Sequence, residues 1–464
     1  MYTARVCVLW LFMIVFACGR PSDSGRDVDA AGTAFSLEEL QRRTFHYFWD
    51  LAYEGNLQIP DRHPALRFSS IAATGFGLTA FLIGVEKGYV AREEAKGRIA
   101  NTLKILYHLP QGPDSTNISG YKGFFYHFLT IDEALRYGDV ELSSIDTGLL
   151  MAGILSAWAY FDRDDPLEVE IRELADKLYR RVEWDWMYVN DEKLSMGWRP
   201  EMGFITASWN GYNEAMILLL LAIGSPTHPI PADAWNGWTS TYRWDTFYNQ
   251  KYLQFSPLFG HQYSHMYIDF RGIFDDYMEE KGIDYFENSR RATLANRAYC
   301  MDNPNSFTGY GPDQWGLTAC DGPAGETRNW QGNEIRFRTY SARGASAIRI
   351  TDDGTIAPTA AGGSVPFAPE ICISALEHMW ETNYDSLIGE FGFKDAFNLS
   401  YNFTDQTQNG WFDKDYLGID QGPILIQTMN YQNEFVWNLM KKVPYIIDGL
   451  RKAGFEGGWL DNMD

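Results

Sequence analysis

The most informative segment of the chain runs Ile145-Asp146-Thr147-Gly148-Leu149-Leu150-Met151-Ala152-Gly153-Ile154-Leu155. Drawn as a helix, it is apolar on nearly every face, and its glycines and alanine leave room where helices crowd together. We therefore expect it to be enclosed by other helices. Asp146 is the exception, since a buried carboxylate is costly unless it is paired or used. An N-cap or first-turn position explains the same residue equally well, and both interpretations remain open.

Helical patterns recur on both sides of this segment. The first begins at Ser36-Leu37-Glu38-Glu39, a capping box with Phe35 and Leu40 at the positions of a hydrophobic staple. Further helices are predicted near 70–87, 91–108, 144–163, 167–182, 208–223, 262–280, 283–300, 366–380 and 434–452. Strand-like alternation is scarce. Some ten helices in one domain predict an all-α fold of stacked helical hairpins closed into an (α/α) toroid.

Composition narrows the class of ligand. The 464 residues carry a formal net charge of −22, which disfavours nucleic acids and anionic lipid surfaces as partners. Aromatic residues make up 16% of the chain, more than packing requires, and flat aromatic faces suit neutral sugar rings. Composition is even, so residues 35–464 are expected to form a single domain.

The N-terminus has the features of an export signal. An apolar run from Val6 to Phe16 is too short to span a bilayer and leads to Cys18, so residues 1–18 resemble a bacterial lipoprotein signal peptide. Residues 19–34 then read as a flexible tether, and the protein is expected in the periplasm or at the outer membrane, lipid-anchored at Cys18. Phe16 is unusual in such a signal, which leaves ordinary signal cleavage as the alternative.

Several other motifs carry little weight. Cys300 and Cys320 could form a disulfide in an oxidising compartment, but buried thiols are the simpler interpretation of these residues and Cys372. Residues 75–80 match a dinucleotide fingerprint without a preceding strand, so close helix packing explains their glycines. His261 and His265 stand at metal-ligand spacing without the Glu of a zinc protease, and no metal site is predicted.

Two further acids stand out beside Asp146. Glu214 precedes the apolar run 217–223, where burial would raise its pKa as a general acid requires, and Trp209 and Tyr212 beside it could contact a sugar. Asp420 is one of three acids within ten residues, among aromatic and turn-forming residues. Helix-dipole or capping roles would account for both positions without catalysis.

Five segments together resemble glycoside hydrolase family 144, the glucoamylase-like domain, over roughly residues 36–455. They are the Glu214 segment, Gly309–Pro323, Phe367–Glu370, Gly392–Asn398 and Tyr416–Pro423. The resemblance implies an (α/α)6 toroid, hydrolysis of β-1,2-glucan with inversion, and no metal or organic cofactor. It also implies Glu214 as general acid, Asp420 as general base and Asp146 as a third acid near the cleavage point.

Candidate substrate-binding residues lie in two regions. One is the long loop region with Trp315, Asp321, Trp330 and Arg336, and the other holds His265, Asp269 and Arg271. Each has a structural alternative, namely core packing for a tryptophan and a buried salt-bridge network for the His/Asp/Arg set. The expected protein is a monomeric β-1,2-glucanase, either endo-acting or sophorose-releasing. A glycan-binding lipoprotein without turnover and a hydrolase of another glucan linkage are the alternatives.

Overall fold

In the computed structural model, which describes residues 34–189 and 192–463, the segment 145–155 lies within α4 (Ser144–Tyr160) and is almost wholly buried. Its main neighbour is α2 (Ile71–Glu86), another helix buried on nearly all sides. Glycine permits the contact, since a Cβ added at Gly153 would lie 2.0 Å from the carbonyl oxygen of Gly75. The prediction that helix packing explains the glycines of residues 75–80 is confirmed for Gly75.

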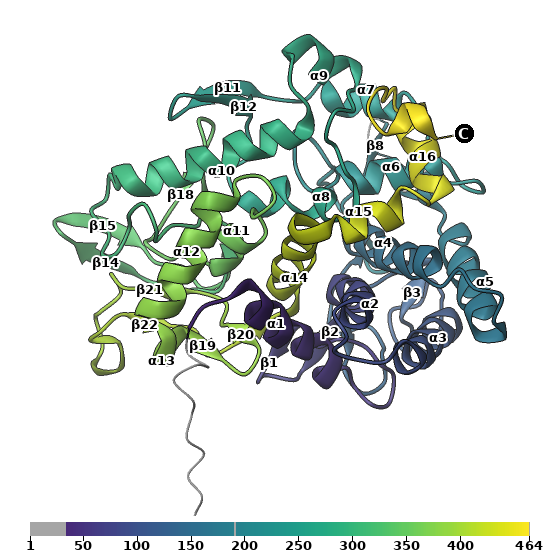
Figure 1. Ribbon diagram of the computed structural model, residues 1–464, viewed down its shortest axis with the longest axis horizontal. Coiled ribbons are helices and arrows are strands. Elements are labelled where there is room, and N and C mark those ends of the chain that lie inside the picture. The colour runs from purple at the N-terminus through teal and green to yellow at the C-terminus, as the bar shows by residue number, and fades with distance from the viewer. Residues whose placement is uncertain (1–33, 190–191, 464) are drawn as a thin grey trace, which may run out of the picture. The chain divides into compact units, whose positions relative to one another are not determined.

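Six inner helices form a closed ring. α2 packs on α4, α4 on α6 and α6 on α8, while α14 packs on α11 and on α2 (Figure 1). Gln262, just before α8, donates hydrogen bonds to the carbonyl oxygen of Ala360 and to Oγ of Ser364, which links α8 to α11. The remaining inner helices are α6 (Met216–Gly224), α8 (Tyr263–Tyr267), α11 (Pro358–Gly362) and α14 (Gly418–Asn433).

Outer helices cover this ring and complete the predicted (α/α)6 toroid, which is confirmed. They are α1 (Leu37–Leu51), α3 (Arg92–His108), α5 (Pro166–Arg180), α10 (Tyr285–Asp302), α12 (Pro369–Thr382) and α16 (Pro444–Lys452). Shorter helices connect them: α7 (Ala234–Thr239), α9 (Asp276–Lys281), α13 (Tyr384–Leu387), α15 (Phe435–Met440), η2 (Trp184–Met187), η3 (Leu258–His261), η4 (Asp405–Thr407) and η5 (Leu460–Asn462).

Three predicted helices are wrong in detail. The helix predicted at 208–223 begins only at Met216, because Gly211 has a φ of +69° in the preceding turn. The helix predicted at 262–280 is interrupted between α8 and α9, where Gly272 also has a φ of +69°. The helix predicted at 434–452 divides before Pro444, which disfavours helical geometry in the preceding residue.

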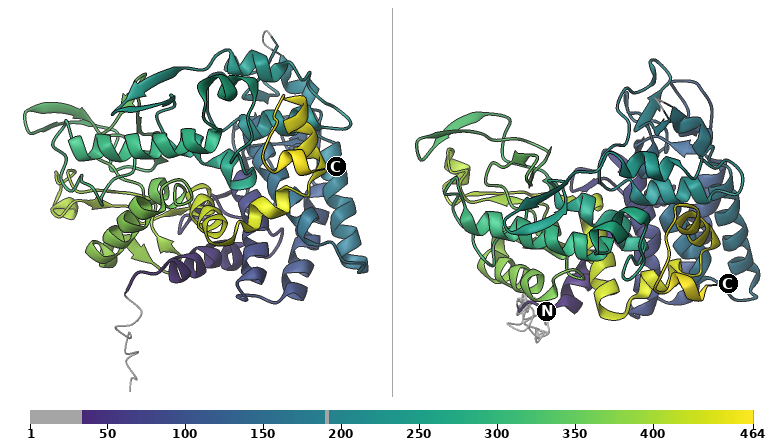
Figure 2. Two further views of the ribbon diagram at one scale, coloured as in Figure 1. Left: turned by 45° about the horizontal axis from the view of Figure 1, so that its top comes forward. Right: turned by 90° about the horizontal axis from the view of Figure 1, so that it is seen from above.

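Short strands gather at one end of the inner helices. β2, β6 and β23 run directly into α2, α4 and α14, so these strands mark the N-terminal ends of the ring. Figure 2 shows the strand hairpins of the chain around the helices. The strands of the described residues all pair in antiparallel fashion. They form two-stranded sheets, except for the three-stranded β10–β9–β6 sheet.

The strands have the following bounds: β1 (Arg62–His63), β2 (Phe68–Ser70), β3 (Gly120–Tyr121), β4 (Phe124–Phe125), β5 (Phe128–Thr130), β6 (Leu142–Ser143), β7 (Tyr188–Val189), β8 (Lys193–Leu194), β9 (Gly197–Arg199), β10 (Gly203–Phe204), β11 (Trp244–Phe247), β12 (Gln250–Leu253), β13 (Ala319–Cys320), β14 (Thr327–Trp330), β15 (Asn333–Arg336), β16 (Ser341–Ala342), β17 (Gly344–Ala345), β18 (Ile350–Thr351), β19 (Ile388–Gly389), β20 (Gly392–Phe393), β21 (Phe397–Asn398), β22 (Trp411–Phe412) and β23 (Tyr416–Leu417).

The compact folded unit spans Phe35–Asp464. Cys300, Cys320 and Cys372 are buried free thiols, so the alternative of a Cys300–Cys320 disulfide is wrong. The predicted signal peptide at 1–18, with its lipidation site, and nearly all of the predicted tether at 19–34 lie outside the described residues. Within the described part of the chain, no helix is long and apolar enough to cross a membrane.

Candidate active site

A cavity of about 140 Å³ opens at the N-terminal ends of the inner helices. Asp146 reaches it from the first turn of α4, Glu214 from the turn before α6, and Ile419 from the first turn of α14. The full lining is His127, Ile145, Asp146, Leu149, Glu214, Phe259, Tyr263, Ala319, Tyr340 and Ile419. Two of the three predicted catalytic acids therefore face one space, and the third, Asp420, adjoins Ile419.

Glu214 has the environment of a proton donor. Its backbone carbonyl accepts a hydrogen bond of 2.9 Å from Oγ of Ser264, which fixes the turn, while its Oε2 is buried without a hydrogen-bond partner. Burial raises the pKa of Glu214 to about 7, and the negative charge of Asp146 adds to this effect. A carboxyl group that keeps its proton near neutral pH can donate it to a bound substrate.

Asp146 is held in place by a serine and a histidine. Ser143, the N-cap of α4, donates its hydroxyl hydrogen to Oδ2 of Asp146, and Nε2 of His127 lies 3.7 Å from Oδ1. His127 also contacts Glu141, with 3.1 Å between Nδ1 and Oε1. Burial alone would lower the pKa of His127, but Asp146 and Glu141 outweigh it and raise the pKa to about 9. Asp146 therefore occupies a first-turn position and also faces the cavity as an ion-paired acid.

Asp420 lies in a second group of acids. The β1–β23 pair places Asp61 and Arg62 beside the segment of Asp415, and backbone bonds from Asp395 to Asp415 and from Asp413 to Ala396 join two further loops. Among the described residues, Arg62 is the cation that forms ion pairs with this group, with Nη1 2.6 Å from Oδ2 of Asp321. The acidic group consists of Asp61, Asp321, Asp395, Asp413, Asp415 and Asp420, all but Asp321 largely buried.

Asp395 and Asp420 are neighbouring buried carboxyl groups, and the pKa of each is raised. Burial raises the pKa of Asp420 to about 7, although a hydrogen bond from Asp395 acts in the opposite direction. Burial and the neighbouring charge of Asp420 raise the pKa of Asp395 well above its ordinary value. Asp395 is thus the protonated partner, and it donates a hydrogen bond that favours the ionised form of Asp420. An ionised carboxylate next to a cavity can accept a proton from water.

Tyr263 lies between the two groups of acids. Its hydroxyl donates a hydrogen bond of 3.3 Å to the carbonyl oxygen of Ile419, next to Asp420. Burial raises the pKa of Tyr263 well above its ordinary value, and the charges of Asp420, Glu214 and Asp146 contribute to the shift. Tyr263 thus lines the cavity together with Glu214 and Asp146, and its hydrogen bond joins it to the residue that precedes Asp420.

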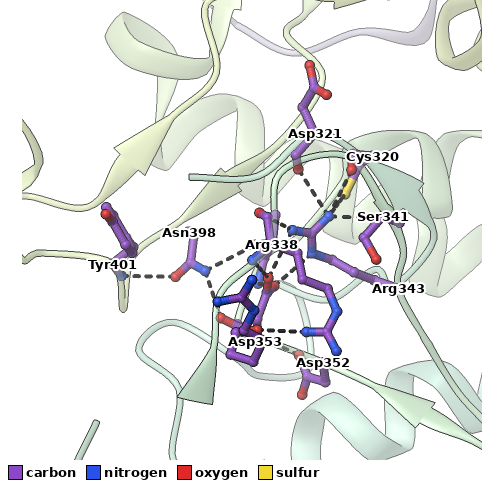
Figure 3. A network of polar contacts seen from close by, with 12 residues as sticks. Cys320, Asp321, Arg338, Ser341, Arg343, Asp352, Asp353, Asn398 and Tyr401 are labelled. Carbon is purple, nitrogen blue, oxygen red and sulfur yellow. Dashed lines mark hydrogen bonds and ion pairs between the residues drawn. The ribbon is translucent and has the colours of Figure 1, made fainter. Parts of the chain in front are cut away.

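A buried arginine organises the loop that carries Asp321 (Figure 3). Arg343 is fully buried and pairs with Asp353, with 2.7 Å between Nε and Oδ1. It also donates hydrogen bonds to the backbone carbonyls of Cys320 at 2.8 Å and Arg338 at 2.9 Å. These bonds fix the backbone beside Asp321 and beside Tyr340, whose half-exposed ring lines the cavity.

Three of the predicted aromatic binding residues are buried away from the cavity. Trp209 donates a hydrogen bond of 2.9 Å from Nε1 to Oγ of Ser144, and the Tyr212 ring stacks on Tyr285. Trp315 is fully buried in the core beside α10 and α12. None of the three lines the cavity, and their contacts are those of packing residues.

The predicted binding set His265, Asp269 and Arg271 likewise lies elsewhere. Arg271 pairs with Asp269, with 2.7 Å between Nε and Oδ1, and Lys441 binds the same carboxylate at 2.6 Å. His265 is buried, and burial lowers its pKa to about 3. These contacts match the alternative of a salt-bridge network that joins helices, and no residue of the set lines the cavity.

The last three predicted binding residues are divided between two places. Asp321 belongs to the acidic group beside Asp395 and Asp420. Trp330 and Arg336 lie on the β14–β15 hairpin, where Trp330 donates a hydrogen bond of 3.3 Å from Nε1 to the carbonyl oxygen of Ser306 and Arg336 is exposed. This hairpin contributes no side chain to the cavity lining.

Sequence reasoning missed His127, Tyr263, Tyr340 and Asp395. Asp395 lies in Gly392–Asn398, a segment that carries the family resemblance, so that segment was a usable signal. Tyr263 is two residues from His265, which was chosen instead. His127 and Tyr340 lie in loops outside the helical pattern, where periodicity gives no information.

The sequence profile of the glucoamylase family named Glycoamylase matches residues 206–444, which include Glu214, Asp395 and Asp420. The chain belongs to this family. The resemblance seen in the sequence, to the glucoamylase-like glycoside hydrolases of family 144, is thereby confirmed. The site described above is therefore that of a Glycoamylase-family protein.

Relatives of this family member act on β-1,2-linked glucose. An exo-β-1,2-glucooligosaccharide sophorohydrolase of Parabacteroides distasonis is 30% identical over 90% of this chain. The match covers 57% of that relative, so the chain spans little more than half its length. The endo-β-1,2-glucanase of Chitinophaga pinensis, solved with sophorotriose and glucose, is 28% identical with a TM-score of 0.78 over 91% of this chain and 99% of its own. A β-1,2-glucanase structure from Parabacteroides distasonis is 27% identical, with a TM-score of 0.77 over 90% of this chain and 59% of its own.

Proposed function

We propose that the protein hydrolyses β-1,2-glucan or its oligosaccharides by an inverting mechanism. The observation that carries the proposal is the cavity lined by Glu214 and Asp146, in which Oε2 of Glu214 is buried without a hydrogen-bond partner and Asp420 follows the lining residue Ile419. Hydrolysis of a glycosidic bond requires one carboxyl group that donates a proton and one carboxylate that accepts a proton from water, and we assign these roles to Glu214 and Asp420. The β-1,2 linkage follows from the activities named for the relatives.

In the proposed reaction, Glu214 protonates the glycosidic oxygen as the bond to the anomeric carbon breaks. Its raised pKa keeps the proton available near neutral pH. Asp146, held by Ser143 and His127, remains next to Glu214 and stabilises the positive charge that develops on the sugar ring.

On the other side, Asp420 accepts a proton from the attacking water. Asp395 donates its hydrogen bond to Asp420 and leaves Asp420 as the ionised member of the pair. The Tyr340 ring, half exposed at the cavity, offers a face on which a sugar ring can stack. No cofactor takes part in this scheme.

The decisive test is incubation of the purified protein with linear β-1,2-glucan, in parallel with β-1,3-glucan, β-1,4-glucan and starch, followed by sizing of the products. We expect sugar release from β-1,2-glucan alone. A single early product such as sophorose would indicate exo action, and a spread of oligosaccharides would indicate endo action. Hydrolysis of another glucan instead of β-1,2-glucan would overturn the proposed linkage specificity. Absence of hydrolysis of all four polysaccharides would favour a glycan-binding protein.

We further propose that the protein is exported and lipid-anchored at Cys18. The apolar run ending at Cys18 and the polar segment after it support this location. Metabolic labelling with a palmitate analogue tests it, because a Cys18→Ala variant should lose the label. Labelling that persists in the variant would contradict the anchor.

A further inference from the structure

Three carboxylates of the acidic group meet at one point. One oxygen atom from each of Asp321, Asp413 and Asp415 lies within 4.8 Å of the other two. Asp413 and Asp415 are only 7% and 6% exposed. Oδ2 of Asp413 and Oδ1 of Asp415 are buried and have no hydrogen-bond partner. Buried, partnerless carboxylate oxygens are costly, which indicates that a ligand completes them.

The local backbone explains why these oxygens are free. Oδ1 of Asp413 accepts hydrogen bonds from the N–H groups of Lys414 at 2.7 Å and Asp415 at 3.2 Å, which uses one oxygen and leaves Oδ2. The two acids follow β22 with one residue between them, in the short segment before β23. Asp321 arrives from the end of β13, a different part of the fold.

Negative charge exceeds positive charge at this point. Arg62 places Nη1 2.6 Å from Oδ2 of Asp321 and 3.6 Å from Oδ2 of Asp415. The same guanidinium also serves Asp61, with 3.2 Å between Nε and Oδ2. Among the described residues, Arg62 therefore pairs with Asp61, Asp321 and Asp415, while Asp413 makes no ion pair. A divalent cation would offset much of the negative charge of these four carboxylates.

We propose that Asp321, Asp413 and Asp415 bind a calcium ion. Calcium prefers oxygen ligands at roughly 2.3–2.6 Å in flexible geometry, so two oxygens on one ion can lie up to about 5 Å apart, as they do in this cluster. Magnesium requires a tighter octahedron at about 2.0–2.1 Å, and we expect it to bind more weakly. Water completes the coordination on the side of Asp321, the most exposed of the three acids.

The ion would have a structural role, because it would crosslink two segments beside Asp395 and Asp420. It joins the loop of Asp321 to the segment after β22, and the N–H of Asp321 holds Oδ2 of Asp395 at 2.7 Å. Asp395 in turn contacts Asp420. The ion takes no part in bond cleavage in this scheme, so its binding is measurable without any glucan and independently of the proposed hydrolase activity.

The test uses the whole protein after treatment with EDTA and gel filtration. Calorimetric titration with CaCl₂ should show one site with a Kd of roughly 10⁻⁵ to 10⁻³ M, and the melting temperature should rise as calcium is added. Asp413→Asn and Asp415→Asn should each weaken binding at least tenfold while remaining folded by circular dichroism, because each substitution removes one carboxylate ligand of the ion.

Asp461→Asn is the matched control. Asp461 lines a separate acidic groove with Asp276, Glu279 and Glu456, so its neutralisation should leave the calorimetric Kd unchanged. Failure of the wild-type protein to bind calcium at millimolar concentrations would overturn the proposal. So would unchanged binding in Asp413→Asn and Asp415→Asn, or stabilisation by sophorose without any by calcium, which would assign the free oxygens to sugar hydroxyls.

Discussion

The backbone N–H of Asp321 donates a hydrogen bond of 2.7 Å to Oδ2 of Asp395, across 74 residues of sequence. One oxygen of Asp395 is occupied in this way, and its Oδ1 has no partner other than the neighbouring carboxyl of Asp420. The bond therefore orients the Asp395 carboxyl so that its proton faces Asp420. The orientation of Asp395 therefore depends on the backbone of Asp321, and Arg343 fixes this backbone through its hydrogen bond to the carbonyl oxygen of Cys320.

Two substitutions of Asp395 should distinguish the effect of its hydrogen bond to Asp420 from the effect of its charge. Asp395→Asn keeps a neutral donor toward Asp420, and we expect kcat on β-1,2-glucan to stay within a few-fold of wild type. Asp395→Ala removes the donor, and kcat should fall roughly 10- to 100-fold with little change in KM. Steady-state kinetics on both variants provides the measurement. Equal losses in the two variants would show that Asp395 acts through its charge instead.

Replacement of Glu214 by Gln should abolish turnover and preserve binding. The amide cannot donate a proton to the leaving oxygen, so kcat should fall by roughly 10²–10⁴. Titration calorimetry with a β-1,2-glucooligosaccharide should give a Kd close to that of wild type. Glu377→Gln, on the exposed face of α12, is the control and should leave kcat unchanged. A Glu214→Gln variant that keeps wild-type kcat would exclude Glu214 as the acid.

The pH profile should show the raised pKa of Glu214. A general acid must be protonated, so kcat/KM should decline as the pH rises through about 7. Stability should depend on the same group, because Glu214 keeps its proton in the folded protein, while the unfolded chain releases this proton above about pH 4.5. The free energy of unfolding therefore decreases between pH 4.5 and 7. Melting curves should show that the melting temperature of Glu214→Gln increases relative to that of wild type between pH 4.5 and pH 8. A difference in melting temperature that does not change with pH would contradict the raised pKa of Glu214.

His127 should have a stability effect in a different pH window. Its pKa rises from 6.5 to about 9 in the folded protein, so the charged imidazolium stabilises fully below pH 6.5 and the contribution is lost as the pH rises through 9. In His127→Asn this contribution is absent. Denaturant titrations should show wild type more stable than the variant at pH 6, with the difference shrinking by pH 9.5.

The sequence predicts the fold well where the pattern has one explanation. α2 and α4 are apolar on all sides and can only lie inside a helical ring, which the structure confirms. α14 was not among the helices predicted from periodicity, since it carries Pro423 and polar residues along its length. It begins at Gly418, so Asp420 lies in its first turn.

The site was less predictable from the chain alone. Asp146, Glu214 and Asp420 stood out by their sequence surroundings, and the family resemblance implied their roles. Most of the predicted binding residues were chosen for chemistry that packing also explains. His265 and Trp315 show the difficulty, because a buried histidine and a buried tryptophan look the same in sequence as ligand-binding ones. The acidic group of Asp395 and Asp420 is assembled by antiparallel strand pairs between distant segments, and no local pattern reports such pairing.

Gly153 allows a close contact between α4 and α2, and its substitution tests this packing directly. A Cβ at this position would lie 2.0 Å from the carbonyl oxygen of Gly75, and neither backbone can move without parting α2 from α4. We expect Gly153→Ala to destabilise the protein by at least about 2 kcal/mol in urea unfolding. Gly97→Ala is the matched control on α3, since nothing lies within 4 Å of its added Cβ. There alanine should stabilise the helix by roughly 0.5–1 kcal/mol. Gly153→Ala with wild-type stability would mean that α2 and α4 are more widely spaced than described.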